Sequence, residues 1–230
     1  SLLMSELINS LSLFSKDNSI RVITISAAGN IFCSGHDLNE LIRETNKDSV
    51  EKIFKMCSQL MLAIQNQPQP VIAQVQGIAT AAGCQLVASC DLAVASSNAL
   101  FATPGVDIGL FCTTPLVALS RSLSKKNALE MLFTGEKITA NKAKDIGLIN
   151  KVVEKKFLKK ETFNLAKIIS EKPTNIVKLG KKSFYNQINL PIEDAYSLAS
   201  EIMAKNMMKT EAKIGINSFF KKEKPIWPED

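Results

Sequence analysis

Two β-type segments with a helical segment between them limit this chain to folds that contain a β-α-β unit. Residues 20–27 and residues 70–76 carry the β-branched or alternating apolar side chains that are typical of strands. Between them, apolar residues recur at helical spacing from Val50 to Ile64, and Pro68 ends that pattern before the second strand. The sequence therefore predicts an α/β fold.

Three more short strands are expected at residues 91–95, 99–102 and 148–153. Residues 81–89 form a short helical segment of small side chains that is too apolar to lie on a surface. We therefore expect a buried helix whose N-terminus points at a partner group.

The C-terminal part of the chain differs in pattern from the rest. From residue 114 onward it is almost wholly helical. Pro173 and Pro191 each stand where a helix begins, in the first-turn position that proline tolerates. We expect a β/α core at residues 1–153 and a helical C-terminal region at residues 154–230.

Length and composition fit a single large domain. The chain has 230 residues, 46% of them hydrophobic, which is enough to bury one sizeable core. No apolar run approaches the roughly 18 to 20 residues that span a bilayer, so we expect a soluble protein without a membrane partner. The printed chain begins with Ser1 rather than methionine, and a native N-terminus with any targeting peptide can therefore be missing from it.

Cysteine and histidine usage argues against disulfides and metal centres. The five cysteines are an odd number and contain no C-x-x-C pair, so we expect small apolar residues in a reducing compartment. That compartment is the cytoplasm or, in a eukaryote, the mitochondrial matrix. His36 is the single histidine, which excludes zinc centres built on several histidines.

The formal net charge of +6 fits nucleic acid, an acidic membrane surface or an anionic ligand such as a nucleotide phosphate. Lysines crowd the C-terminal half, where we expect most of them to solvate helix faces. The basic residues are not interleaved with aromatic ones, which argues against nucleic acid as a partner. The chain has no G-x-G-x-x-G motif, and residues 180–183 lack the preceding glycine of a phosphate-binding loop.

Two glycine-containing segments, at residues 32–38 and 77–84, each leave a strand and enter a helix. The first backbone N–H groups of a helix have no partner within it and lie at the positive end of its dipole, so they stabilise a developing negative charge. Two such helix starts that face each other make an oxyanion hole.

The residues of these segments resemble the crotonase, or enoyl-CoA hydratase/isomerase, superfamily. The first signature of the family is similar to Phe32-x-Ser34-Gly35-x-Asp37-Leu38. The second is similar to Gly77-x-Ala79-x-x-Ala82-Gly83-Cys84-x-Leu86-x-x-x-Cys90-Asp91, and the third to Leu132-Phe133-Thr134-Gly135 with residues 138–150. More narrowly, residues 34–38 and 99–106 resemble the enoyl-CoA hydratase domain-containing protein 3 subgroup.

The resemblance implies a crotonase-type spiral of β-β-α turns followed by a C-terminal helical trimerisation region, assembled as a trimer or a dimer of trimers. It also implies an acyl-coenzyme A thioester as substrate or ligand, no tightly bound cofactor, and a role in fatty acid metabolism. The thioester oxygen would accept hydrogen bonds from the backbone N–H groups of His36 and Ala82. Residues expected to help bind the ligand are Ser34, Gly35, Asp37, Leu38 and Gly83, with Lys221 and Lys222 meeting the phosphates across a subunit boundary.

The chain departs from the family at the residues that move protons. The family's hydratases use two glutamates, and the matching positions here hold Gln85 and Gly105. Thr113 stands where some isomerases and dehalogenases place an aspartate. The nearest remaining carboxylate is that of Asp107, which shares a face with Gly105 if the segment is extended. The glycine at residue 105 also fits relatives that make dihydroxynaphthoyl-CoA and use bicarbonate as the base.

The side chain of His36 has two interpretations. It could pair with Asp37 or cover the nucleotide, or it could act as a catalytic acid or base, for which an imidazole has a suitable pKa.

Two functions remain open. The retained oxyanion segments favour an enoyl-CoA hydratase-like or isomerase-like enzyme, a lyase or isomerase that acts through a thioester enolate. The missing glutamates favour a catalytically silent acyl-CoA binder or assembly subunit. A remote third alternative is an RNA-binding side role, which only the positive charge supports.

Overall fold

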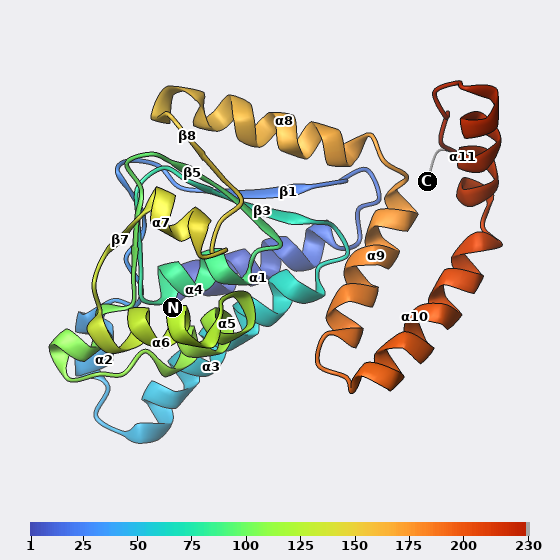
Figure 1. The fold of residues 1–230 in the computed structure, drawn as a ribbon. Helices are drawn as coiled ribbons and strands as arrows, with labels where there is room; N and C mark the ends of the chain where they lie inside the picture. The colour runs from blue at the N-terminus through green and yellow to red at the C-terminus, as the bar shows by residue number, and fades with distance from the viewer. Residues whose placement is uncertain (229–230) are drawn as a thin grey trace.

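The computed structural model describes residues 1–228 (Figure 1). The strands are short: β1 Ile23–Ser26, β2 Ile31–Cys33, β3 Val71–Val75, β4 Ile78–Thr80, β5 Leu92–Ser96, β6 Leu100–Ala102, β7 Ile138–Thr139 and β8 Lys151–Val153. The helices of the core are α1 Leu2–Phe14, α2 Leu38–Arg43, α3 Lys47–Asn66, α4 Ala82–Ser89, α5 Thr113–Ser122, α6 Lys125–Thr134 and α7 Ala140–Asp145. They are followed by α8 Leu158–Ser170, α9 Thr174–Gln187, α10 Ile192–Met207 and α11 Thr210–Lys221, and 3-10 helices lie at Pro104–Ile108 and Lys155–Phe157.

Successive turns of the chain place one strand in each of two sheets. In the first sheet β1, β3 and β5 lie side by side and parallel, and β8 joins next to β5. In the second sheet β2, β4 and β6 follow the same parallel order, and β7 pairs antiparallel with β6. Helical segments follow each strand pair, which confirms the predicted α/β spiral of β-β-α turns.

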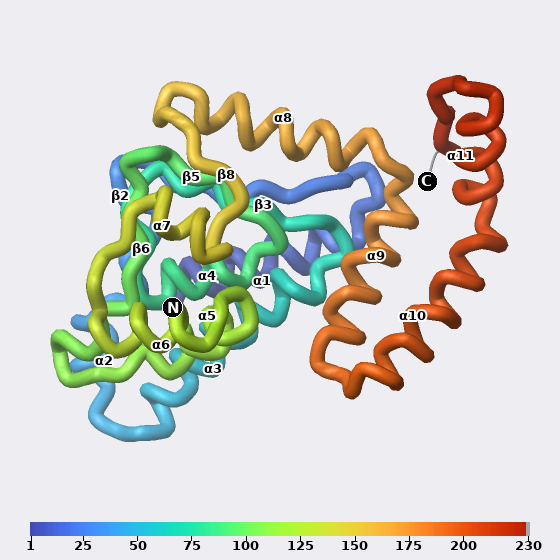
Figure 2. The backbone as a smooth tube through the Cα atoms, viewed as in Figure 1, coloured from blue at the N-terminus to red at the C-terminus, as the bar shows by residue number. Residues whose placement is uncertain are grey.

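The main hydrophobic core lies between the first sheet and the helices on one of its faces. Helix α4 is buried along nearly its whole length and packs against α3 and α5, which confirms the predicted buried helix. On the other face of the sheet, α8 packs through Leu158 against Ile72 and Val94. Figure 2 shows α8 lying over this sheet, roughly along β1 and β3. Helix α8 falls within the predicted C-terminal region, yet it covers the core.

Helices α9, α10 and α11 project away from the core (Figure 1). A nearly buried ion pair joins α9 to the core, because the Lys181 ammonium lies 2.6 Å from Asp91 Oδ2. The same ammonium donates to the carbonyl oxygens of Ile64 and Gln69, and the Tyr185 hydroxyl donates to the other oxygen of Asp91. Lys181, in the 180–183 segment that lacks the spacing of a phosphate-binding loop, therefore holds α9 against the core.

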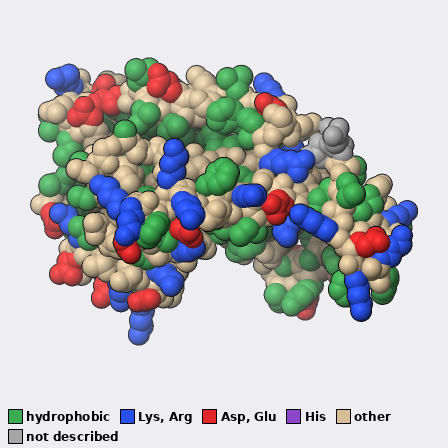
Figure 3. Space-filling model, turned by 90° about the horizontal axis from the view of Figure 1, so that it is seen from above, with side chains coloured by type: hydrophobic (Ala, Val, Ile, Leu, Met, Phe, Trp, Pro, Cys, Tyr) green, Lys and Arg blue, Asp and Glu red, His purple; other side chains and the backbone are tan. Residues whose placement is uncertain are grey.

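The projecting helices expose many large apolar side chains, including Ile192, Tyr196, Met203, Met207, Phe219 and Phe220. Figure 3 shows these helices as a smaller lobe beside the core, with hydrophobic and basic side chains on its surface. Helices α9 and α10 also enclose an apolar groove of about 420 Å³. Such a surface is typical of a region that packs against another protein.

The structure corrects several expectations from the sequence. Strand β4 and most of β2 lie within the two glycine-containing segments, which the sequence places after a strand. At three residues each they are too short to show an alternating pattern. Helix α1 was not expected. Pro173 and Pro191 stand at the N-cap, one residue before the first helical turn of α9 and α10. None of the helices in residues 1–228 combines the length and apolar character of a bilayer crossing.

Candidate active site

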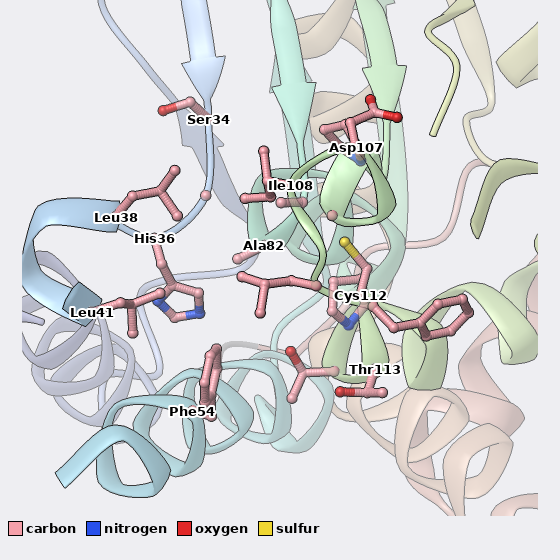
Figure 4. Close-up of a pocket in the computed structure, with 18 of the residues that line it drawn as sticks. Ser34, His36, Leu38, Leu41, Phe54, Ala82, Asp107, Ile108, Cys112 and Thr113 are labelled. Carbon is pink, nitrogen blue, oxygen red and sulfur yellow. The ribbon is translucent and has the colours of Figure 1, made fainter. Parts of the chain in front are cut away.

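A largely apolar cavity of about 880 Å³ opens beside the N-terminus of α4 (Figure 4). Four parts of the chain line it: the segment from Ser34 into α2, Phe54 of α3, Ala81 and Ala82 at the start of α4, and most of residues 104–115. The cavity size lies near the upper end of the range for small-molecule sites, so it can hold a bulky apolar group.

The two glycine-containing segments meet at Gly35. This residue has a φ of +101°, which a side chain would strain, and a β-carbon there would lie 3.0 Å from the β-carbon of Ala81 and 3.4 Å from the nitrogen of Ala82. Thr80 Oγ1 also donates to the carbonyl of Ser34 at 3.2 Å. The N–H group of residue 36 is therefore held next to the start of α4.

Ala81 has a strained backbone. Its φ of 50° and ψ of −120° are unusual for a residue with a β-carbon, and such strain is often found at functional sites. Ala81 donates its own N–H to the carbonyl of Ala102, which anchors this turn to β6. The next residue, Ala82, begins α4 with its N–H free of the helix.

Within the described chain, neither the N–H of His36 nor that of Ala82 donates to a protein acceptor. Both residues line the cavity, and Ala82 lies at the positive end of the α4 dipole. Two unpaired N–H groups beside one apolar cavity suit a carbonyl oxygen that gains negative charge.

The neighbouring residues of the first segment also line the cavity. The carboxylate of Asp37 caps α2 by accepting the N–H of Asn39 at 2.8 Å, and Leu38 begins that helix with its side chain half exposed. Ser34 is exposed at the rim. Asp37 is therefore a helix cap as well as a lining residue.

The imidazole of His36 is half buried and contacts the Phe54 ring edge-on, with ring centres 5.1 Å apart and planes at 83°. Its Nε2 atom is buried and has no hydrogen-bond partner among residues 1–228. Burial lowers the pKa of His36 below its usual value, while the Glu40 carboxylate opposes this shift.

Two residues of α4 that the sequence singled out lie outside the lining of this cavity in the described structure. Gln85 is buried, and its Oε1 accepts a weak hydrogen bond from the Cys57 thiol at 3.7 Å. Gly83 packs against β2, since a β-carbon there would lie 2.0 Å from the carbonyl oxygen of Cys33. Gly83 therefore sets the close approach of α4 to β2.

Gly105 does line the cavity, and it is buried under its own segment. A β-carbon at this residue would lie 2.6 Å from the Leu110 carbonyl oxygen and 2.8 Å from Cys112 Sγ. Burial raises the pKa of the Cys112 thiol above its usual value, and an interaction with the Gly105 backbone lowers it in part. Cys112 is thus a neutral lining group.

Asp107 and Thr113 are both exposed at the cavity margin. Asp107 lies in the 3-10 helix, near the left-handed Gly135 that ends α6. Figure 4 shows its carboxylate directed away from His36 and Ala82. The helical conformation of this segment rules out the extended geometry in which residues 105 and 107 would share a face.

Lys221 and Lys222 do not line the cavity of the described chain. They lie at the exposed end of α11, on the projecting helices and far from α2 and α4 (Figure 1). A contact with a ligand in this cavity would therefore need a second copy of the chain.

Sequence reasoning missed several apolar lining residues, chiefly Leu41, Phe54, Leu110 and Phe111. Phe54 belongs to the same helical pattern as buried core residues, so periodicity does not distinguish its role. The apolar run 108–112 could have indicated these lining residues, because exposed apolar side chains that gather in one segment often mark a binding site. In residues 1–228 no group of three or more His, Cys, Asp or Glu side chains is placed to hold a metal ion.

Known proteins resemble this chain over nearly its whole length. Residues 1–230 match the profile of the family described as enoyl-CoA hydratase/isomerase. The mitochondrial enoyl-CoA hydratase domain-containing protein 3 of Xenopus laevis is 52% identical over 211 residues, which are 92% of this chain and 72% of that protein. The human protein of the same name is 50% identical over 210 residues, which are 91% and 69% of the two chains.

Solved structures give the same picture. The crystal structure of human enoyl-CoA hydratase domain-containing protein 3 is similar with a TM-score of 0.95 at 47% identity, and the match covers 98% of this chain and 89% of that one. An enoyl-CoA hydratase from Mycobacterium smegmatis has a TM-score of 0.95 at 48% identity, covering 97% and 87%.

Proposed function

The chain belongs to the enoyl-CoA hydratase/isomerase family, and from this premise we propose that it binds an acyl-CoA thioester and polarises the thioester carbonyl with the backbone N–H groups of His36 and Ala82. The family and subgroup resemblance of the sequence is confirmed by the matches. The bound ligand, the reaction and the residues remain our proposal.

One observation carries this proposal: two N–H groups without protein acceptors lie beside the same apolar cavity. Gly35 and the strained Ala81 keep them in place. Donors fixed before the ligand arrives stabilise an enolate oxygen more than a neutral carbonyl, because the enolate carries the greater charge. The arrangement thus favours reactions that pass through a thioester enolate.

The same cavity gives little support for ordinary hydration. Hydration needs a group that activates water at the β-carbon and another that moves a proton at the α-carbon. Gln85 cannot ionise and lies outside the lining, and Gly105 has no side chain. We therefore propose an enolate-forming, isomerase-like activity on apolar acyl groups, with weak or absent hydratase activity.

A second candidate is a catalytically silent acyl-CoA binder or assembly subunit. The specific observation in its favour is that the segment 105–112 leaves no room for a side chain at Gly105, where a β-carbon would lie 2.6 Å from the Leu110 carbonyl oxygen. Such a protein would keep the N–H pair for affinity alone.

The two candidates differ in a direct experiment. The protein is mixed with saturated, 2-enoyl, 3-enoyl and branched acyl-CoAs, with binding measured by calorimetry and products by mass spectrometry. Binding with double-bond migration supports the enzyme, and micromolar binding without any product supports the silent binder. Absence of binding to every thioester would contradict both.

We further propose that α9, α10 and α11 form a trimer interface, alone or within a dimer of trimers. The exposed apolar side chains of these helices and the groove between α9 and α10 support it. Lys221 and Lys222 could then meet CoA phosphates at a neighbouring copy. Light scattering should give three or six times the mass of one chain, and a monomeric mass at micromolar concentration would refute this.

The names of the relatives suggest a cellular compartment for this protein. The similar proteins from Xenopus laevis and human carry the word mitochondrial in their names. We propose the mitochondrial matrix if this chain comes from a eukaryote and the cytoplasm otherwise, which imaging of the tagged full-length protein would test.

A further inference from the structure

An enolate forms only if some group takes the α-proton of the thioester. Among the described residues that line the cavity, the titratable side chains are His36, Asp37, Asp107 and Cys112. The carboxylate of Asp37 caps α2, Asp107 is exposed and directed away, and the Cys112 thiol is kept neutral by burial. His36 is the remaining candidate.

The His36 ring is placed for contact with a ligand. Figure 4 shows it directed into the space bounded by Phe54, Ala82 and Cys112. The edge-on contact with Phe54 restricts its rotation. Because the same residue supplies one of the two N–H donors, its ring lies within a side chain's reach of the carbonyl that those donors would hold.

The Nε2 atom of His36 supplies an independent argument. It is buried and lacks a hydrogen-bond partner in residues 1–228, although nearly all buried polar atoms have one. A ligand in the cavity could provide that partner. Burial lowers the pKa of the ring, and the Glu40 carboxylate offsets this only in part, so the imidazole is neutral near pH 7 and can accept a proton.

We infer that the imidazole of His36 is the proton carrier of this site and acts in place of the two missing glutamates. The inference rests on the proposed acyl-CoA function. In the step, the α-carbon–hydrogen bond breaks, its electron pair moves into the enolate whose oxygen the two N–H groups hold, and the proton forms a bond with Nε2. Return of the proton to the α-carbon or, in a 3-enoyl thioester, to the γ-carbon completes exchange or isomerisation.

The test measures exchange of the α-protons of trans-3-hexenoyl-CoA in D₂O by mass spectrometry. The His36→Gln and His36→Ala variants keep the backbone N–H but lose the proton carrier, so the exchange rate should fall by about 10²- to 10⁴-fold. Their affinity for the thioester, measured by calorimetry, should stay within about tenfold of the parent. Asp107→Asn tests the competing carboxylate at the cavity margin.

The outcomes separate this inference from the function beneath it. If the parent binds the thioester but exchanges no deuterium, or if His36→Gln exchanges as fast as the parent, the inference is wrong and acyl-CoA binding stands. If Asp107→Asn alone loses exchange, the carrier is Asp107. If the parent binds no thioester, the proposed function fails and this inference fails with it. Thermal unfolding of each variant shows whether a loss reflects misfolding.

Discussion

The carbonyl oxygen of Leu110 occupies the space that a side chain at Gly105 would need. A β-carbon at Gly105 would lie 2.6 Å from this oxygen, and the Leu110 N–H donates to the Gly105 carbonyl at 2.9 Å, which holds the segment closed. The family resemblance matches this position to one of the two hydratase glutamates. In this structure the backbone leaves no room for a side chain at Gly105.

Restoring both glutamates should not create a hydratase. In a Gln85→Glu, Gly105→Glu variant the new side chain at 105 must displace Leu110 and Cys112, and overpacking of this kind costs about 1–3 kcal/mol of stability. We expect a lower melting temperature and no gain in crotonyl-CoA hydration over the parent. Loss of the enoyl thioester absorbance measures the reaction.

A matched control for the added atoms is Gly180→Ala in α9, where a β-carbon would meet nothing within 4 Å. Its stability should equal or slightly exceed that of the parent, because alanine favours helices over glycine by up to about 1 kcal/mol.

Rapid hydration by the Gln85→Glu, Gly105→Glu variant would contradict this prediction. It would show that the segment 105–112 opens readily and that its closure has no functional meaning.

Gly35→Ala should disable the oxyanion site. The new β-carbon meets Ala81 and the nitrogen of Ala82, and a φ of +101° strains any residue other than glycine. Loss of one oxyanion donor costs other enzymes about 10²- to 10³-fold in turnover, so we expect a loss of at least about 10²-fold in α-proton exchange. Gly29→Ala also has a positive φ but open space around it, and it should exchange normally. Equal rates in both variants would contradict the role of Gly35.

Ala81→Gly should stabilise the fold. A non-glycine residue at φ 50° stores roughly 1–3 kcal/mol of strain, and glycine removes it at an entropic cost of about 0.5–1 kcal/mol. We expect a net gain of about 1 kcal/mol, which shifts the melting temperature by about 2–4 °C in a chain of this size. Ala81→Val should show the opposite sign. A lower melting temperature for the glycine variant would contradict the strain that we assign to Ala81.

Much of the fold could be predicted from the sequence, because long patterns carry it. The helical spacing of α3 and the apolar run of β3 each span enough residues to reveal their period. The three-residue strands β2 and β4 are formed by pairing with each other, which no local pattern reports.

The site was predictable only in part. Glycine and motif spacing singled out His36 and Ala82, and both residues line the cavity in the structure. The orientation of Gln85 could not be predicted because it depends on Cys57, which is 28 residues away in the sequence. The closure over Gly105 depends on how the segment up to Leu110 folds back, which no periodic pattern reports.

Lys181→Met should weaken the joint between α9 and the core. Lys181 and Asp91 have side chains only 7% and 16% exposed, so removing the ammonium leaves a buried carboxylate without its counter-charge. Breaking a buried pair in this way costs about 3–5 kcal/mol, which urea unfolding would measure. Lys182→Met, on the neighbouring exposed lysine, should change stability by less than about 0.5 kcal/mol. Similar effects for both variants would show that the ion pair does not hold α9.

The pH dependence of stability should report on His36 directly, because it is the single histidine of the chain. Burial lowers its pKa in the folded protein, while the Glu40 carboxylate opposes this. In the pH range between the lowered pKa and the ordinary one, the unfolded chain therefore binds more protons than the folded chain. Stability is then fully present above the ordinary histidine pKa of about 6.5 and is lost as the pH falls through the lowered value. Urea unfolding of the parent between pH 7 and 5 should show this loss, and the His36→Gln variant should lack it. In a proton NMR titration the imidazole of His36 should have its midpoint below pH 6.5. A midpoint at the ordinary histidine value would mean that the ring is solvated and that its Nε2 is not buried.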